Sequence, residues 1–389
     1  MANAAKEAES RLLAADRSLG AQPAEVKLPR PVSKFWCLFP VAFSLFWSAI
    51  GLNEEWALDE FGDLLPVAHL RMIILFFCLT FLAHTIPLYF VSRTCESEEY
   101  QEMANAVCAA DPRFHDAIVQ TLNGIWWQSA KLGLAGIVGY GLIGYFAFRR
   151  VNAGLYLSTL GSLAMVSRFE SGFIEVLVKM CNQDVNNFIA LMIPDVPEGS
   201  PNARAEKSLQ HFATCPDWQA VSSAHHEMDS RMEGLWAPEV GSSLLGPAVL
   251  LRIGQGLGIA IIGVVLRDVE AKIFAWSVGL FMISRGIFAL QGAADLTTRC
   301  QTANPRFGLT AIKVVVNGFA CHCRMSQKEE TCFVKFNGYL QSTELGVELF
   351  GTMVTPGLVS NLIVAMLTNL PIMVGLLESV MGRVSTEVI

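Results

Sequence analysis

The chain is poor in charged residues. Only 16% of its 389 residues are Asp, Glu, Lys or Arg, below the roughly 25% of ordinary soluble domains, whereas 52% are hydrophobic. The hydrophobic residues fall in long blocks instead of alternating with polar residues, as lipid-facing helices require. The composition therefore predicts an all-α, polytopic membrane protein, and a soluble all-α protein is the weaker interpretation.

The sequence also lacks the motifs of several classes of protein. The net charge is −7 and no basic tract suited to a phosphate backbone is present, which excludes nucleic acid as a partner. No GxSxG, Walker A or paired-carboxylate signature occurs, so we expect no enzyme activity. The glycines of "IGQGLG" (253–258) lack the strand that precedes a dinucleotide site. They predict close packing of helices, and we expect no cofactor.

Cysteine and histidine form no standard site. The ten cysteines are scattered through the chain, which argues against a disulfide framework and indicates reduced thiols. The segment "CHCRMSQKEETC" (321–332) brings Cys and His together without a zinc spacing, so we expect ordinary thiols and no metal. The segment "SSAHHEMDS" (222–230) is not HExxH, and we expect it to be a solvated, charged stretch.

Seven blocks carry enough apolar residues to suggest membrane spans. A crossing helix needs roughly 17 to 25 predominantly apolar residues, and the third and fourth blocks are short and closely joined. These two form either full spans or a re-entrant pair, which would leave five crossings. The seven blocks are Phe35 to Leu52, Met72 to Val91, Leu132 to Phe148, Val151 to Ser167, Ser243 to Leu266, Ile273 to Leu290 and Phe350 to Leu377.

The distribution of Lys and Arg predicts the orientation. Both are concentrated in the N-terminal tail and in the long connections, which predicts that these lie in the cytoplasm. The first outer connection, "NEEWALDEFGD" (53–63), has five acids and no base. The predicted organisation is a mobile cytoplasmic tail (1–31), a single transmembrane domain (32–377) with inner connections 92–128, 182–240 and 291–349, and a short C-terminal tail (378–389).

The spans follow a 2+2+2+1 pattern, with three hairpins and a final helix. The long connections contain stretches such as "DPRFHDAIVQTLNGIWWQ" (111–128) and "PRFGLTAIKVVVNGF" (305–319), which predict amphipathic helices that lie beneath the membrane as a cytoplasmic layer. The stretch from Arg149 to Arg168 is weakly similar to the stretch from Arg267 to Arg285. This similarity arises either from an internal repeat of hairpins, a common way of building transporters, or from chance.

Three arginines lie within or at the edge of spans: Arg168, Arg252 and Arg285. Charge in hydrocarbon is costly, so these residues are candidates for a ligand site or pathway; the alternatives are snorkelling to lipid phosphates and structural pairing. Glu175 and Lys179 return to the helical face of Arg168 and form a polar stripe with it. Three cations at similar depth favour an anionic solute, ligand or lipid headgroup.

Each arginine stripe also contains a glycine. Gly172 lies on the stripe of Arg168, and Gly292 lies on the stripe of Arg285. A missing side chain at these positions predicts either a close approach of helices or room for water or a ligand.

The last helix has polar residues in its centre. Asn361, Thr368 and Asn369 lie between Pro356 and Pro371, and Asn361 and Thr368 share one helical face. Such residues either form hydrogen bonds with a neighbouring helix or line a pore. A pore around this helix would make the protein a homo-oligomer.

These features predict a channel or transporter in the lipid bilayer for a small, anionic solute. The layout is similar to that of insect-type gustatory and odorant receptors, although the C-terminal signature of that family is missing from "AMLTNLPIMVGLL" (365–377). The resemblance implies a ligand-gated receptor-channel with a cytoplasmic N-terminus and an inner anchor. A third hypothesis is a structural subunit of a membrane complex.

Overall fold

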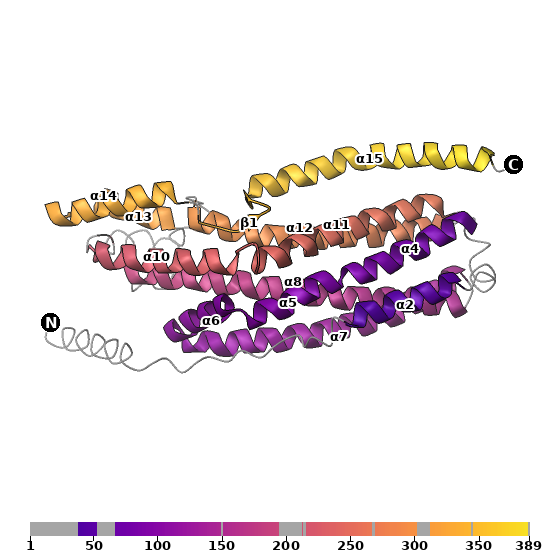
Figure 1. Ribbon diagram of the computed structural model, residues 1–389. Helices are drawn as coiled ribbons and strands as arrows, with labels where there is room; N and C mark the ends of the chain where they lie inside the picture. The colour runs from indigo at the N-terminus through magenta and orange to yellow at the C-terminus, as the bar shows by residue number, and fades with distance from the viewer. Residues whose placement is uncertain are drawn as a thin grey trace.

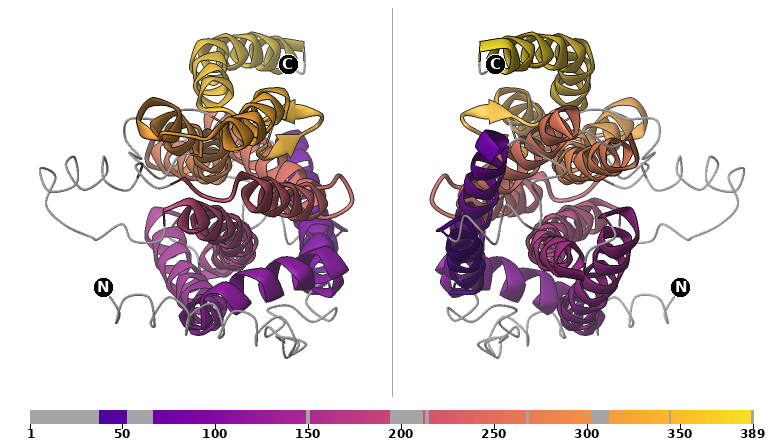
Figure 2. Two further views of the ribbon diagram at one scale, coloured as in Figure 1. Left: turned by 90° about the vertical axis from the view of Figure 1, so that its left-hand side faces the viewer. Right: turned by 90° about the vertical axis from the view of Figure 1, so that its right-hand side faces the viewer.

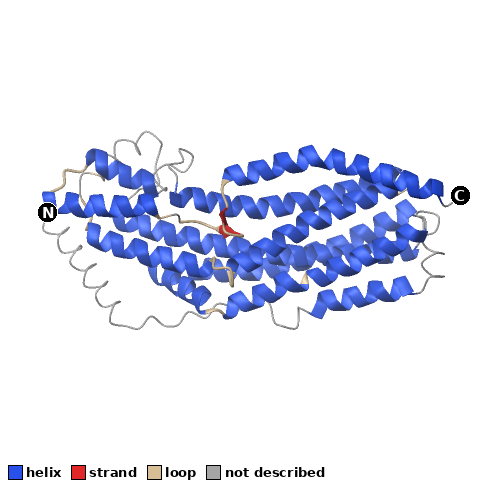
Figure 3. Ribbon diagram, turned by 45° about the horizontal axis from the view of Figure 1, so that its top comes forward, coloured by secondary structure: helices blue, strands red, loops and turns tan. Residues whose placement is uncertain are grey.

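The computed structural model describes residues 38–52, 67–148, 151–193, 212, 215–266, 269–301, 312–343 and 345–387. In these ranges the chain is all-α apart from one two-stranded hairpin (Figure 3), as the sequence predicts. The elements are α2 (Leu38–Leu52), α4 (Val67–Ala83), α5 (Thr85–Glu96), α6 (Glu98–Ala110), α7 (Pro112–Phe148), α8 (Val151–Met192), α10 (Trp218–Leu235), α11 (Gly241–Val265), α12 (Val269–Gln301), α13 (Ile312–His322), α14 (Gln327–Ser342), β1 (Glu348–Leu349), β2 (Thr352–Met353) and α15 (Pro356–Glu387).

Most of the helices lie along one common axis and form an elongated body (Figure 1). The two longest, α7 with 37 residues and α8 with 42, are an antiparallel pair. At 1.5 Å per residue they are about 56 and 63 Å long, roughly twice the thickness of the hydrocarbon core. Residues 112–128, which the sequence predicts to be helical, are the first half of α7 and continue without interruption into its apolar half.

At one end of the body, α6, α10, α13 and α14 surround the ends of the long helices. We call this part the end bundle (left in Figure 1). Its core is aromatic: the ring of Trp218 lies 4.8 Å from that of Phe333, 5.3 Å from that of Phe319 and 6.0 Å from that of Phe336. Asp217 caps α10 by accepting bonds from two backbone N–H groups. The long connections therefore form a packed bundle and not a flat layer.

Three helices in the described ranges are long and apolar enough to cross a membrane: Ile74–Glu96, Gly241–Val264 and Lys272–Cys300. They coincide with the second, fifth and sixth predicted spans. The other four predicted spans fall on α2, α7, α8 and α15.

The second span has a local irregularity at His84, between α4 and α5. Pro87 has no N–H to donate to the carbonyl oxygen of Ala83. The helical ladder nevertheless continues, because the N–H of His84 donates to the carbonyl oxygen of Thr80 at 3.3 Å and the N–H of Leu88 donates to that of His84 at 3.3 Å. The imidazole of His84 is fully buried inside the bundle.

The glycines of "IGQGLG" bring α11 against α12. A Cβ added at Gly256 would lie 2.5 Å from the carbonyl oxygen of Gly279, and one added at Gly279 would lie 2.6 Å from that of Gly256. The two backbones therefore touch at this crossing, as close helix packing predicts. Gly254 has nothing within 4 Å and takes no part in the contact.

The β-hairpin fixes the start of α15. Its turn residues Phe350 and Gly351 have φ values of 54° and 72°, as a two-residue type I′ turn requires. Ser242 of α11 donates to the carbonyl oxygen of Glu348 at 2.7 Å. From there α15 runs along the outer edge of the body (Figures 1 and 2). The helix begins at Pro356 instead of Phe350, and it continues to Glu387 through the segment expected to be a tail.

Candidate functional site

The three arginines singled out in the sequence converge on one short segment of α8. Arg252 comes from α11, Arg285 from α12, and Arg168 from α8 itself. All three form hydrogen bonds with side chains or backbone atoms of Ser167 to Glu175, within little more than two helical turns. This convergence joins helices that are far apart in the sequence.

Arg252 is the buried member of the group, with an exposed fraction of 0%. Its Nε donates to Ser167 Oγ at 2.9 Å, and its Nη2 donates to Ser167 O at 2.6 Å and to Glu170 Oε2 at 3.3 Å. Its Nη1 has no partner among the described residues. Arg252 therefore does not snorkel to a lipid phosphate; Glu170 neutralises it inside the bundle.

Glu170 also connects Arg252 to His84. The second carboxylate oxygen, Oε1, lies 2.8 Å from His84 Nδ1, and Gln255 Nε2 lies 2.6 Å from His84 Nε2. Glu170 and Gln255 thus contact both ring nitrogens of His84 and hold the orientation of the imidazole. The four side chains form one polar chain that connects the second span to α8 and α11.

A cavity of about 210 Å³ lies on the other side of α8, against α12. Glu175, which lines the cavity, accepts a hydrogen bond from Arg168 at 2.9 Å, and Arg168 also donates to Gln128 of α7 at 2.7 Å. Arg285 reaches across and donates to Ser171 Oγ at 3.1 Å. The polar stripes of α8 and α12 thus face one shared groove. Its lining includes Ser171, Glu175 and Lys179 from α8 and Arg285, Phe288 and Gly292 from α12.

The two glycines of the stripes have different roles. A Cβ at Gly172 would lie 2.8 Å from the side chain of Ile125, so this glycine lets α7 approach α8. Gly292 has nothing within 4 Å and lines the groove. One position serves helix packing, and the other leaves space.

The polar residues of α15 lie apart from the arginine group. Asn361, Thr368 and Asn369 are all exposed. Thr368 Oγ1 donates to the carbonyl oxygen of Val364 at 2.9 Å, and Asn369 Nδ2 donates to that of Ala365 at 2.6 Å, both within α15. In the described part of the chain, none of the three side chains bonds to a neighbouring helix.

Sequence reasoning did not single out three members of the site: His84, Glu170 and Gln255. Pro87 marks the irregularity beside His84, and Glu170 lies on the same helix as Arg168. These signals are visible, but the partner of each residue is on another helix. No local pattern could therefore have assigned the pairs.

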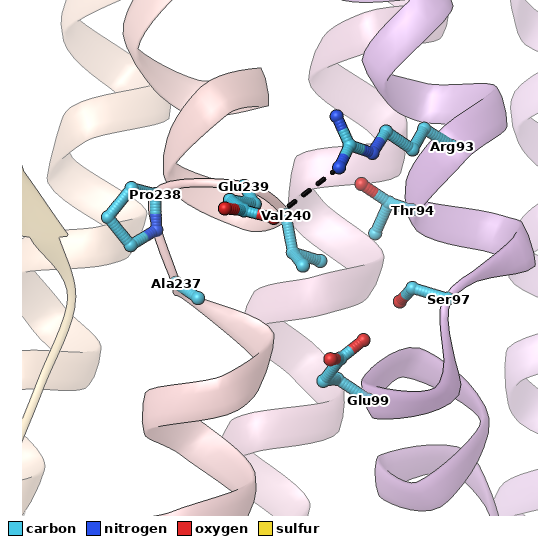
Figure 4. A pocket seen from close by; sticks show the side chains of 8 residues that line it. All are labelled: Arg93, Thr94, Ser97, Glu99, Ala237, Pro238, Glu239 and Val240. Carbon is cyan, nitrogen blue, oxygen red and sulfur yellow. Dashed lines mark ion pairs between the residues drawn. The ribbon is translucent and has the colours of Figure 1, made fainter.

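A second cavity, of about 360 Å³, lies between α5 and the connection from α10 to α11 (Figure 4). Arg93 and Glu239 point toward one another across it, with Nη2 and Oε2 3.5 Å apart, and Glu99 lies at its edge. Both partners of this ion pair are well exposed, so the pair contributes little. Among the described residues that line it, Thr94 is the one buried polar residue, and we do not regard this cavity as the site.

The segment 222–230 is not fully solvated as expected. His225 is buried, and its ring packs 5.2 Å from Phe188, 5.7 Å from Phe336 and 5.4 Å from Tyr339. Burial lowers the pKa of His225 from 6.5 to about 4, so the ring is neutral at pH 7. The prediction of a solvated stretch is therefore wrong for His225, which other side chains surround. It is confirmed for His226 and Glu227, which are exposed.

The cysteine segment contains one close pair. The Sγ atoms of Cys215 and Cys323 lie 2.8 Å apart. In the described ranges, no three His, Cys, Asp or Glu side chains are placed to hold a metal ion.

Comparisons with protein-family models, with curated proteins and with solved structures found no match. Fold and site define an all-α protein with three described helices that are long and apolar enough to cross a membrane, and with a buried ionic core.

Proposed function

We propose that the protein is a multi-pass membrane channel or transporter for a small, anionic solute. In this proposal several copies of the chain surround a common pathway, and α15 of each copy lines it. The observation that carries the proposal is the exposed, mixed polar stripe of α15.

The stripe consists of residues that return to one face of α15: Asn361, Ala365, Thr368, Ile372 and Gly375, all exposed. The opposite side packs on the body through Val359, Leu362 and Ile363. A helix that faced lipid alone would place its amide and hydroxyl groups in hydrocarbon, which is unfavourable. A ring of copies would give these groups water or each other as partners.

The proposed topology has seven spans. In addition to the three helices that are long and apolar enough to cross, it uses α2, α7, α8 and α15. The Lys and Arg distribution supports a cytoplasmic location for the end bundle and the N-terminus. The length of α7 and α8 supports full crossings over a re-entrant pair, since each has residues to span the bilayer and to extend beyond it.

The choice of an anionic solute depends on unpaired positive charge near the cytoplasmic side. Arg252 is neutralised by Glu170 and Arg168 by Glu175, but Arg285 and Lys179 form no ion pair with a described carboxylate. Arg285 and Lys179 therefore leave an excess of positive charge at the α8–α12 groove, which supports an anion as the solute.

The test is electrical. Purified protein in a planar bilayer of neutral lipid should conduct, with a reversal potential in a salt gradient that indicates anions. Asn361→Leu and Thr368→Val should lower the conductance because they remove polar groups from the stripe, whereas Asn123→Leu, at an exposed position of α7, should not. Saturable uptake without channel-sized currents would indicate a transporter. Silence in both assays would contradict the proposal.

A ligand-gated receptor-channel is the second candidate. The end bundle fits the inner anchor that the resemblance to insect-type receptors implies, and the α8–α12 groove offers a ligand site within the helical body. Currents that require an added ligand would favour this candidate. Co-purification with unrelated chains, and loss of stability without them, would favour a structural subunit.

A further inference from the structure

The groove between α8 and α12 has two kinds of lining. Ile174, Val178 and Phe288 supply apolar surface, and the ring of Phe288 is 62% exposed. Arg285 and Lys179 supply positive charge at the same groove. A small inorganic anion would gain nothing from the apolar surface, whereas an amphiphilic anion would use both kinds of lining.

The charge of the groove is not balanced by the protein. Arg168 and Glu175 form an ion pair at 2.9 Å. Arg285 has Ser171 Oγ as its hydrogen-bond partner, and in the described ranges neither Arg285 nor Lys179 forms an ion pair. A ligand with two negative charges would neutralise this excess.

The depth of the groove corresponds to lipid headgroups. If the hydrocarbon core begins near Val151, the start of α8, then Ser171 lies about 30 Å along the helix, which equals the thickness of that core. Lys179 follows about 12 Å further, outside the hydrocarbon. The guanidinium of Arg285, held on Ser171, is thus at the level of the phosphates of the cytoplasmic leaflet.

We infer that the groove binds an anionic phospholipid of the cytoplasmic leaflet. Arg285 and Lys179 contact the phosphate and the second negative charge of its headgroup, and an acyl chain packs on Phe288. A zwitterionic lipid such as phosphatidylcholine is disfavoured because its headgroup has no second negative charge for Lys179. Basic pockets between membrane helices on the cytoplasmic side are suited to such headgroups. This inference goes beyond the proposed function and does not depend on conduction.

The experiment measures lipid retention. The full chain is reconstituted in nanodiscs of phosphatidylcholine with one fifth phosphatidylserine and re-extracted, and the retained lipid is determined by native mass spectrometry. We expect phosphatidylserine to be enriched over its share of the bilayer. Arg285→Gln and Lys179→Gln should each lower the enrichment about fivefold. Lys335→Gln, which removes an exposed charge from α14 in the end bundle, is the matched control and should not.

Two further variants separate the headgroup site from folding and from conduction. Arg285→Lys should restore most of the enrichment, since it keeps the charge. Asn361→Leu should retain phosphatidylserine as the native chain does, because Asn361 lies outside the groove. The result of the lipid experiment is therefore independent of the result of the conductance experiment.

Equal enrichment in native and Arg285→Gln proteins would overturn the inference. So would full displacement of the lipid by soluble glycerophosphoserine at similar concentration, because that result would assign the groove to a free anion.

Discussion

Arg252 of α11 and Glu170 of α8 form an ion pair in which neither side chain is exposed, with Nη2 and Oε2 3.3 Å apart. Removing one partner would leave the other charge buried without compensation, at a cost of about 3–5 kcal/mol. We therefore expect Arg252→Met to lower the thermal stability of the protein in detergent strongly. The double variant Arg252→Met with Glu170→Leu should recover part of the loss.

The matched control is Arg285→Gln, because Arg285 is only half-buried and bonds a hydroxyl group. This change should lower the unfolding temperature less. Additive losses in the Arg252 and Glu170 double-mutant cycle would show that the two side chains do not interact.

The contact of α11 with α12 should be sensitive to one methyl group. Gly256→Ala would place a Cβ 2.5 Å from the carbonyl oxygen of Gly279, so the helices must separate. We expect a lower unfolding temperature and a lower yield of folded protein. Gly254→Ala, two residues away and facing open space, makes the same chemical change and should be tolerated. Equal effects of both changes would rule out the backbone contact.

The exposed stripe of α15 should lie against a second copy of the chain. In a chain with the exposed Cys321 changed to serine, Thr368→Cys should form an intermolecular disulfide when the membrane is oxidised. Leu362→Cys, which packs on the body of its own chain, should remain monomeric on a non-reducing gel. Dimers at both positions, or at neither, would argue against a ring around α15.

Cys215 and Cys323 should be the first thiols to join. Their Sγ atoms are 2.8 Å apart, and diamide can accept the two hydrogens that are lost when the S–S bond forms. We expect a peptide pair linked at these residues by mass spectrometry of a non-reducing digest. The link should be absent in Cys323→Ser and present in Cys321→Ser.

This oxidation should also accelerate with pH. Burial and the neighbouring Cys215 sulfur raise the pKa of Cys323 to about 12, so the reactive thiolate is scarce at neutral pH. A link of Cys323 to Cys332 instead would contradict the placement of the segment from 215 to 217.

His225 should make the end bundle sensitive to acid. Burial lowers its pKa from 6.5 to about 4, with opposing effects of Asp229, which raises the pKa, and His226, which lowers it further. The unfolded chain therefore binds a proton that the folded chain rejects. The free energy of unfolding is therefore unaffected by His225 above pH 6.5. As the pH falls toward 4, protonation of His225 in the unfolded chain lowers this free energy by up to about 3 kcal/mol.

His225→Phe removes this titration. The difference in unfolding temperature between pH 7.5 and pH 5 should be smaller in this variant than in the native chain. Because His226 is exposed, His226→Phe should keep the native difference. An unchanged pH dependence in His225→Phe would mean that the ring is accessible to protons in the folded protein.

Much of the site could be predicted from helical periodicity. The stripe of Arg168, Glu175 and Lys179 follows from a period of 3.6 residues, and Arg168 does bond Glu175 along one helix. The glycines of "IGQGLG" were predicted to pack helices closely, and Gly256 does so. The long connections were assigned correctly as helical, but their packing into a bundle depends on aromatic contacts between distant segments, such as Trp218 with Phe333.

The sequence by itself determined the helical class, the apolar blocks and the faces of single helices, because composition and period are local properties of the chain. Only the tertiary structure decided which arginine is neutralised and which is free. The charge of Arg252 is compensated because packing of α11 against α8 brings the guanidinium to the carboxylate of Glu170. The charge of Arg285 is not compensated in this way, because its hydrogen-bond partner on α8 is the hydroxyl group of Ser171. These pairings join residues more than 80 positions apart in the sequence. At such separations the packing of the helices determines the partner, because a local sequence pattern carries no information about the opposite helix.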